Sequence, residues 1–172
     1  MKYNNKFIIL TLIALSILLG SLTSCRTSQS AVEKAKKAKL IDEQIENLDF
    51  KFIANHAYPI GYPSIPLTSV YDVTVSSDTI KAYLPYFGRA YRAPMNSSEG
   101  GIKFESTDFE SEVLTGKMYG EWHVTIKTKD TTRPFTLYFH LWNNGTARLD
   151  VREPDRQSIS FQGLIEERKI EE

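Results

Sequence analysis

The residue types that most often perform enzymatic chemistry are scarce in this chain. It has one cysteine, Cys25, and three histidines, His56, His123 and His140. A metal site built on a single element needs ligands at close spacing, such as two histidines one helical turn apart, and these histidines are scattered. No Gly-x-Ser-x-Gly motif provides a serine nucleophile on a strained turn. The sequence therefore assigns no catalytic residue, no metal ligand and no cofactor.

Two of the histidines could still meet in space. His123 and His140 are expected on the outward faces of neighbouring strands, where histidines commonly have no role. A deep pocket that gathered two histidines and a carboxylate within about 4 Å would favour a hydrolase, whereas the same groups spread over a convex sheet would exclude one. A charged, solvated connection, rather than a catalytic pair, is expected for the acidic residues Glu105, Asp108, Glu110 and Glu112.

The single cysteine follows a signal-peptide pattern. A basic start precedes an apolar stretch, residues 7–19, which at about 20 Å is too short to cross a hydrocarbon layer of about 30 Å. Leu-Thr-Ser then precedes Cys25 and resembles the lipobox of bacterial lipoproteins, whose cysteine thiol takes a thioether-linked diacylglycerol. We expect cleavage between Ser24 and Cys25 and lipidation of Cys25. The alternative is an ordinary secretory signal, residues 1–24, with a chance cysteine.

The lipid on Cys25 would hold the protein at a membrane, because two acyl chains anchor stably. Arg26, rather than an acidic residue, follows the cysteine, and no acidic run comes after it. We therefore expect a protein of the cell envelope, on the outer membrane, with its domain facing the periplasm. Basic and acidic side chains balance at 21 each, which argues against a nucleic-acid partner.

Residues 25–31 read as the lipidated cysteine and a polar linker. Apolar residues then recur at steps of three and four over residues 32–48, which predicts an amphipathic helix. Residues 49–172 are expected to form a single β-rich domain. This domain has no disulfide, because no second cysteine exists.

The β-rich part shows apolar residues at every second position, as in half-buried strands. The clearest feature is a hairpin, in which residues 135–142 and 147–151 flank an Asn-Asn-Gly turn. Three prolines within residues 56–67 predict an ordered loop or edge segment instead of regular pairing. The expected fold class is mainly β: an antiparallel sandwich, a curved sheet or a partly open barrel, preceded by one amphipathic helix after the lipid anchor.

One segment concentrates aromatic and guanidinium groups and is the candidate binding site of the sequence. Aromatic faces beside guanidinium groups suit stacking on sugar rings and pairing with carboxylate or phosphate. The alternative is structural, with aromatic rings closing the end of the sheet and arginines bound to backbone carbonyls. The residues concerned are Tyr83, Tyr86, Phe87, Arg89, Tyr91 and Arg92.

Several motifs together resemble one known family. Besides the lipobox and the Asn-Gly turn, they are Tyr-Asp-Val-Thr-Val (71–75), Leu-Pro-Tyr-Phe-Gly-Arg-Ala-Tyr (84–91), Gly-Gly-Ile-Lys-Phe (100–104) and Ile-Ser-Phe-Gln-Gly (159–163). Over residues 50–165 the chain resembles a lipoprotein family of the Bacteroidetes catalogued as a domain of unknown function (DUF4251-like). The resemblance implies a place in the envelope, and it implies no activity, cofactor or catalytic residue.

Two Asp-Thr-x tripeptides, at Thr79 and Thr131, resemble short acceptor sites for O-linked glycans in exported proteins of that lineage. Both are expected in turns that a transferase could reach.

Two classes of function remain at this stage. The first is a non-catalytic cell-envelope lipoprotein that binds an envelope protein or a glycan. The alternative is a periplasmic hydrolase acting on envelope glycan or peptide material. Within the first class, an uncovered apolar face would indicate a protein partner, and a narrow aromatic groove would indicate sugar.

Overall fold

The structure is a computed structural model that describes residues 26–92 and 100–166. Contacts divide the chain into two units, with the boundary between Lys36 and Lys37. Within the described ranges, no helix is both long enough and apolar enough to cross a membrane. Ser24 and Cys25 lie outside the described residues, so cleavage and lipidation at this point stay predictions. The elements are α2 (Arg26–Glu46), β1 (Phe50–Pro59), β2 (Ile65–Val75), β3 (Ile80–Leu84), β4 (Ile102–Ser106), β5 (Phe109–Thr115), β6 (Glu121–Thr128), β7 (Thr136–Trp142), β8 (Thr146–Arg152) and β9 (Ile159–Ile165).

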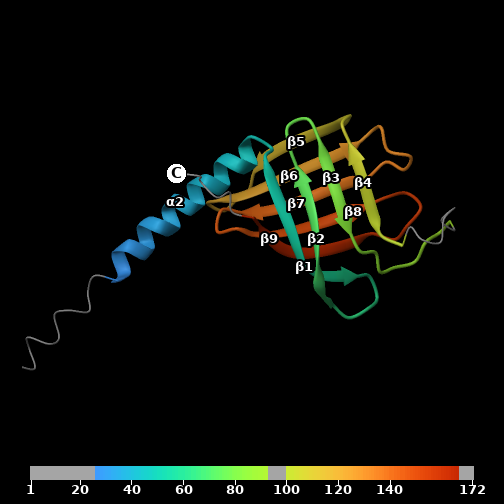
Figure 1. The fold of residues 1–172 in the computed structure, drawn as a ribbon, viewed down its shortest axis with the longest axis horizontal. Coiled ribbons are helices and arrows are strands. Elements are labelled where there is room, and N and C mark those ends of the chain that lie inside the picture. The colour runs from blue at the N-terminus through green and yellow to red at the C-terminus, as the bar shows by residue number, and fades with distance from the viewer. Residues whose placement is uncertain (1–25, 93–99, 167–172) are drawn as a thin grey trace, which may run out of the picture. The chain divides into compact units, whose positions relative to one another are not determined.

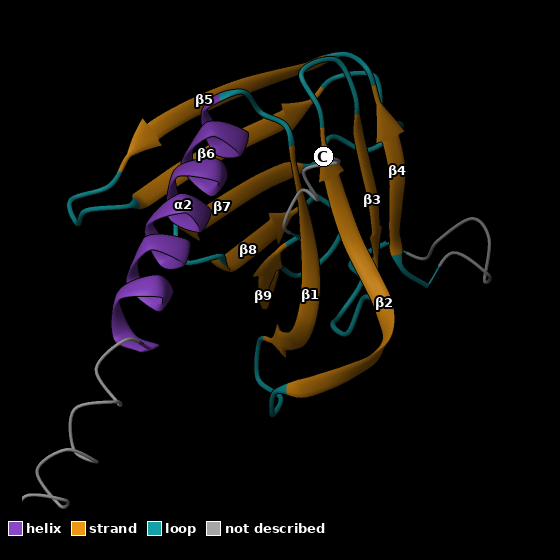
Figure 2. Ribbon diagram, turned by 60° about the vertical axis from the view of Figure 1, so that its left-hand side comes forward, coloured by secondary structure: helices purple, strands orange, loops and turns teal. Residues whose placement is uncertain are grey.

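The nine strands of the described residues belong to one sheet, in the order β4-β3-β2-β1-β9-β8-β7-β6-β5, and neighbouring strands are antiparallel. Figures 1 and 2 show the sheet curling between its end strands, β4 and β5. The predicted mainly β class is therefore confirmed. Of the architectures expected, the structure is a curved, nearly closed, barrel-like sheet, because a sandwich would need two sheets.

The two ends of the sheet are joined by a short turn that one carboxylate holds. Asp130, from the loop between β6 and β7, accepts hydrogen bonds from the backbone N–H groups of Thr107 at 2.9 Å and Asp108 at 3.2 Å. It also accepts one from the hydroxyl of Ser106. These hydrogen bonds lower the pKa of Asp130 to about 2, and the bond from the Ser106 hydroxyl has the largest effect. A charged side chain thus fixes the connection between β4 and β5.

The core fills the concave side of the sheet. Alternating side chains of each strand point inward, and the rings of Phe50 and Phe52 meet the ring of Phe139 edge-on at 5.4 and 6.1 Å. The last turns of α2 add Ile41 and Ile45, which are 1% and 0% exposed. Burying a side chain of this size contributes about 1.5–3 kcal/mol to the free energy of unfolding. The end of the helix, after Lys36, is therefore part of the core.

The helix is longer at its start and shorter at its end than the sequence predicts. It begins at Arg26, inside the expected linker, because no glycine or proline interrupts residues 26–46. It ends at Glu46 because Leu48 has a left-handed backbone with φ of 50°. In that turn the N–H of Asp49 donates to the carbonyl of Gln44 at 2.8 Å, which closes the last turn of the helix.

The proline-rich segment forms the end of β1, a turn and the start of β2, so the expectation that prolines exclude strand pairing over residues 56–67 is wrong, whereas the expected edge segment agrees with the position of Pro66. His56 of β1 lies opposite Pro66 of β2 and Gln162 of β9, next to an irregularity in register after Ala54. β3 pairs with β2 only over residues 72–75. Pro66 therefore lies beyond the end of β3. No strand pairs with β2 on that side at Pro66, so a missing N–H there removes no hydrogen bond between strands.

The acidic stretch also forms strands where a solvated connection was expected. Glu105 lies on β4 and pairs with Lys81 at 3.2 Å, and Glu110 on β5 pairs with Lys129 at 2.8 Å. In β5 only Phe109 and Val113 are even half-buried. Charged side chains on an end strand commonly prevent it from pairing with another chain. Because they replace the alternating apolar residues, the strand cannot be predicted from a hydrophobic pattern.

Candidate functional site

The aromatic and arginine segment follows β3 and runs against the loop between β8 and β9. The N–H of Tyr91 donates to the carbonyl of Asp155 at 2.8 Å, and the N–H of Gln157 donates to the carbonyl of Arg89 at 3.0 Å. Phe87 is half-buried against the core. Backbone hydrogen bonds therefore fix this segment to a neighbouring loop.

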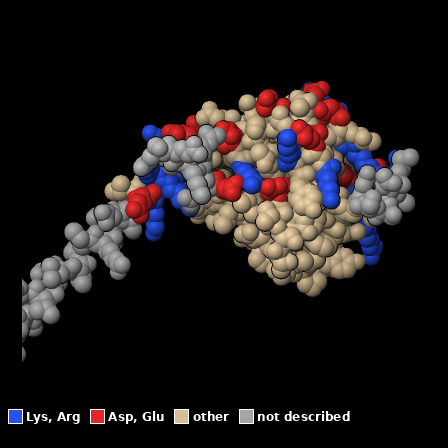
Figure 3. All heavy atoms as spheres, viewed as in Figure 1, with Lys and Arg blue, Asp and Glu red and all other residues tan. Residues whose placement is uncertain are grey.

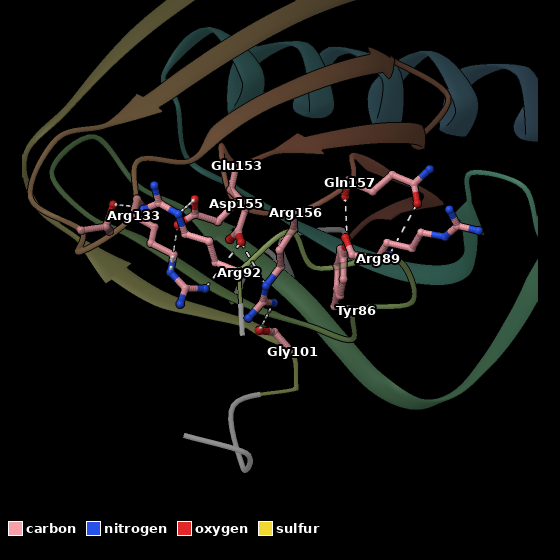
Figure 4. A network of polar contacts seen from close by, with 10 residues as sticks. Tyr86, Arg89, Arg92, Gly101, Arg133, Glu153, Asp155, Arg156 and Gln157 are labelled. Atoms are coloured by element: carbon pink, nitrogen blue, oxygen red, sulfur yellow. Dashed lines mark hydrogen bonds and ion pairs between the residues drawn. The ribbon is translucent and has the colours of Figure 1, made fainter. Parts of the chain in front are cut away.

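Tyr86 is half-buried and packs against the core, as Phe87 does. Its hydroxyl lies 2.9 Å from the carbonyl oxygens of both Arg89 and Gln157, and the guanidinium of Arg156 lies 4.9 Å from its ring centre (Figure 4). Burial raises the pKa of Tyr86, so the hydroxyl stays a neutral donor. A Cβ on Gly88 would lie 2.7 Å from this hydroxyl, which explains a glycine at that position.

A buried ion pair lies behind Tyr86. Nε of Arg156 is 3.0 Å from Oε1 of Glu153, and the two side chains are 7% and 5% exposed. Nη1 of Arg156 also donates to the carbonyl of Gly101 at 3.1 Å, so the arginine reaches across to the chain before β4 (Figure 4). Burial raises the pKa of Glu153, and Arg156 and Arg133 oppose that rise. These groups neutralise one another, which is typical of a structural network.

The remaining predicted binding residues do not form one site. Arg92 is 80% exposed in its side chain and contacts Asp155 at 3.6 Å. Tyr83 faces outward on β3, where its ring stacks on Tyr71 at 5.6 Å and Lys103 lies 4.7 Å from its centre. The structure therefore separates Tyr83 from the segment that holds Tyr86.

The two expected glycosylation positions differ in their surroundings. Thr79 is half-buried in the turn between β2 and β3. The hydroxyl of Thr131 lies 2.7 Å from that of Thr128 and donates to the carbonyl of Arg133 at 2.7 Å. Modification at Thr131 would have to break that second hydrogen bond.

A row of polar side chains crosses the convex face of the sheet, away from the predicted segment. Strand register places the members of the row opposite one another from β1 to β6, and their side chains are exposed or half-buried. In order across the sheet they are His56, Gln162, Arg148, His140 and His123.

A hollow of about 470 Å³ lies along this row. The aromatic side chains of Tyr58 and Trp142 line it together with Arg148 and Gln162. The hydroxyl of Tyr58 donates to Oε1 of Gln162 at 2.8 Å, and Nη2 of Arg148 lies 3.3 Å from Oδ1 of Asp150. The hollow thus combines two aromatic rings, a guanidinium and an amide that neighbouring groups hold in place.

The hairpin of β1 and β2 beside the hollow is uncharged. No aspartate, glutamate, lysine or arginine occurs between Lys51 and Asp72. Figure 3 shows the matching area without charged side chains, at the place of this hairpin in Figure 1. Several of its larger apolar side chains are exposed, namely Tyr58, Ile60, Tyr62 and Val70.

Two histidines and a carboxylate meet at the other end of the row. Oε1 of Glu121 lies 2.6 Å from Nε2 of His140 and 3.8 Å from Nε2 of His123, and the two rings stack at 4.4 Å. The N–H of Met118 donates to Oε2 of Glu121 at 2.9 Å and, with His140, lowers the pKa of Glu121. A Cβ on Gly116 would overlap the Glu121 side chain. The group is gathered as a hydrolase would need, but it lies on the convex face of the sheet.

Sequence reasoning found the two histidines and missed Glu121, Trp142 and Arg148. Trp142 and His140 share the outward period of the predicted hairpin, and Arg148 lies on its other strand, opposite His140. That register could have found them. Glu121 lies two residues before His123 on β6 and therefore shares its face, so the same period could have found it.

Comparisons with known proteins agree with this fold. A family model described as "Domain of unknown function (DUF4251)" matches residues 32–165. The crystal structure of a DUF4251 family protein from Bacteroides eggerthii is similar, with 12% sequence identity and a TM-score of 0.57. The match covers 77% of this chain and 89% of that one. Comparison with curated proteins gives no match.

Proposed function

Because this chain belongs to the DUF4251 family, as its motifs predicted, we propose a function from its own surface: it binds an acidic glycan of the cell envelope, without catalysis, in the hollow between Tyr58 and Trp142. Aromatic rings offer flat apolar faces on which the C–H face of a sugar ring can stack. A guanidinium binds carboxylate or phosphate in a planar, two-pronged way. The hollow contains both kinds of group.

The hydrogen bonds around the hollow support this proposal. Gln162 accepts from Tyr58, so its amide N–H group is turned to other acceptors. Arg148 is 56% exposed in its side chain and uses one side for Asp150, which leaves a partly solvated guanidinium for a ligand. Little rearrangement is needed on binding, because these side chains are already held, and such preorganisation favours affinity.

The envelope location forms the second part of the proposal. A diacylglycerol on Cys25 would anchor the protein to the outer membrane, with the domain on the periplasmic side, where glycans of the envelope are within reach. Labelling with a radioactive or alkyne fatty acid tests this part. A Cys25→Ala variant that still carries label would contradict it.

A glycan array tests the binding. The full-length protein in detergent is applied to neutral and acidic glycans, and a preference for acidic ones is expected. Trp142→Ala and Arg148→Ala should abolish the signal. Tyr119→Ala is the matched aromatic control, because Tyr119 is 96% exposed and lies in the turn before β6. Signals that survive both hollow variants would overturn the proposal.

An envelope protein is the alternative partner, and the exposed apolar side chains of the uncharged hairpin favour it. A photo-crosslinking amino acid at Tyr62 in living cells tests this alternative. A discrete protein adduct at Tyr62, together with no binding on the glycan array, would identify the ligand as a protein and not a glycan.

A further inference from the structure

Glu121 presents one oxygen to two histidines and keeps the other oxygen for the backbone. Oε2 accepts the N–H of Met118 at 2.9 Å, while Oε1 faces Nε2 of both His140 and His123. A carboxylate held through one oxygen has its second oxygen aimed in a fixed direction. The turn before β6 therefore orients Oε1 toward the two rings.

We propose that Glu121, His123 and His140 bind one divalent transition-metal ion of the zinc class. Their ligand atoms all lie within 4.8 Å of one another. Around a tetrahedral zinc ion, with bonds of about 2.0–2.2 Å, neighbouring ligand atoms are about 3.3 Å apart. The separations of 2.6 and 3.8 Å from Oε1 lie on either side of that value. The limit of 4.8 Å for all three pairs exceeds it by about 1.5 Å, so side-chain shifts of at most about that size complete the site.

The surroundings of the histidines suit such a site. The His123 side chain is 47% exposed, which leaves its ring free to turn toward an ion. His140 packs on Trp142 at 4.1 Å between ring centres, which limits its rotation. Two imidazole nitrogens and one carboxylate oxygen are a ligand set that zinc accepts, with a further position open to water. The site is distinct from the glycan hollow, although Trp142 touches both.

The ion replaces a hydrogen bond between two of its ligands. Nε2 of His140 and Oε1 of Glu121 are hydrogen-bonded at 2.6 Å. A neutral imidazole carries one hydrogen, and when this hydrogen is on Nδ1 the lone pair of Nε2 is available to a metal. Metal binding therefore replaces the hydrogen bond between His140 and Glu121 through a change of tautomer.

The experiment uses the full-length protein in detergent, purified without a polyhistidine tag. Zinc is titrated by calorimetry, and cobalt(II) by visible absorption. One ion per chain is expected. His123→Ala and Glu121→Gln should weaken binding by at least about tenfold. Glu121→Gln keeps an oxygen for the N–H of Met118, so it removes the charge and preserves the turn.

His56→Ala is the matched control. His56 faces outward in the same row, but the strands β8 and β9 separate it from His140. Its loss should leave affinity and stoichiometry unchanged. The proposal is overturned if zinc and cobalt give no binding at millimolar concentration, if binding survives both site variants, or if His56→Ala weakens it equally. No glycan enters this experiment, so its result is independent of the proposed function.

Discussion

Nε2 of His140 lies 2.6 Å from Oε1 of Glu121, although 19 residues separate them in the chain. The contact connects the start of β6 to the convex face of β7. It marks one end of a row of polar side chains, and the hollow between Trp142 and Tyr58 lies along the same row. Both proposed sites therefore lie on the convex face of the sheet, while its concave face is filled by the core.

Tyr86→Phe should lower the free energy of unfolding by about 0.5–1.5 kcal/mol, because it removes a hydroxyl that donates to backbone carbonyls. Urea denaturation measures this loss. Tyr91→Phe is the control, since Tyr91 is 68% exposed, and it should leave stability unchanged. Unchanged stability in Tyr86→Phe together with a lost glycan signal would instead assign Tyr86 to binding.

Asp130→Asn should destabilise the protein at neutral pH, since the amide replaces a carboxylate that accepts several hydrogen bonds at the β4–β5 turn. The folded pKa of about 2 lies below the ordinary value of 3.8. The contribution of Asp130 is therefore fully present above pH 3.8 and is lost as the pH falls through about 2.

Thermal unfolding at several pH values tests this prediction. The difference between wild type and Asp130→Asn should stay constant above about pH 4 and shrink as the pH falls from there toward 2. Asp78→Asn, in the exposed turn between β2 and β3, serves as the control and should match wild type throughout. A difference that does not change with pH would contradict the role of the charge.

Gly163→Ala should destabilise the sheet by about 1–3 kcal/mol or more, because a Cβ there would overlap the carbonyl of Ile53 on the neighbouring strand. Backbone atoms in the middle of a sheet cannot easily give way. Gly100→Ala is the control, since a Cβ at Gly100 meets no atom within 4 Å. Equal stability of the two variants in urea would show that β1 and β9 lie further apart than described.

Ile45→Ala should lower the free energy of unfolding by about 2–5 kcal/mol, because Ile45 is fully buried and its truncation leaves a cavity between the helix and the sheet. Val32→Ala, at a position that is 69% exposed on the same helix, should be nearly neutral. Chemical denaturation compares them. If Ile45→Ala were also neutral, the end of α2 would not be part of the core.

The hairpin of β7 and β8 could be predicted from sequence because its period of two is local and its Asn-Gly turn is distinctive. β5 could not, since its stability comes from pairing with β6 rather than from an apolar face. Pro66 suggested a loop or an edge segment, and the sequence could not decide between them because a proline in β2 is tolerated only beyond the end of β3, whose length no local pattern reveals.

The candidate site was harder to predict than the fold. Nearness in sequence grouped Tyr83 with Tyr86, but the strand turns Tyr83 outward and the following loop turns Tyr86 toward the core. Conversely, Tyr58 and Trp142 are far apart in sequence and line one hollow only because the sheet order places β1, β9, β8 and β7 side by side. A site whose residues come from several strands can be predicted only when the order of the strands in the sheet is known, and the sequence alone did not provide that order.

The central claim is that an acidic envelope glycan binds between Tyr58 and Trp142, and the two tryptophans of the chain test it directly. Each gives one indole N–H signal in a ¹H–¹⁵N spectrum. Trp142 lines the hollow, whereas the indole of Trp122 donates to Asp42 at 2.7 Å beside the helix. On titration with acidic glycan fragments, such as muropeptides released from peptidoglycan, the signal of Trp142 should shift and that of Trp122 should stay. A Trp142 signal that does not move at millimolar fragment concentration, or a shift of Trp122 alone, would contradict the account.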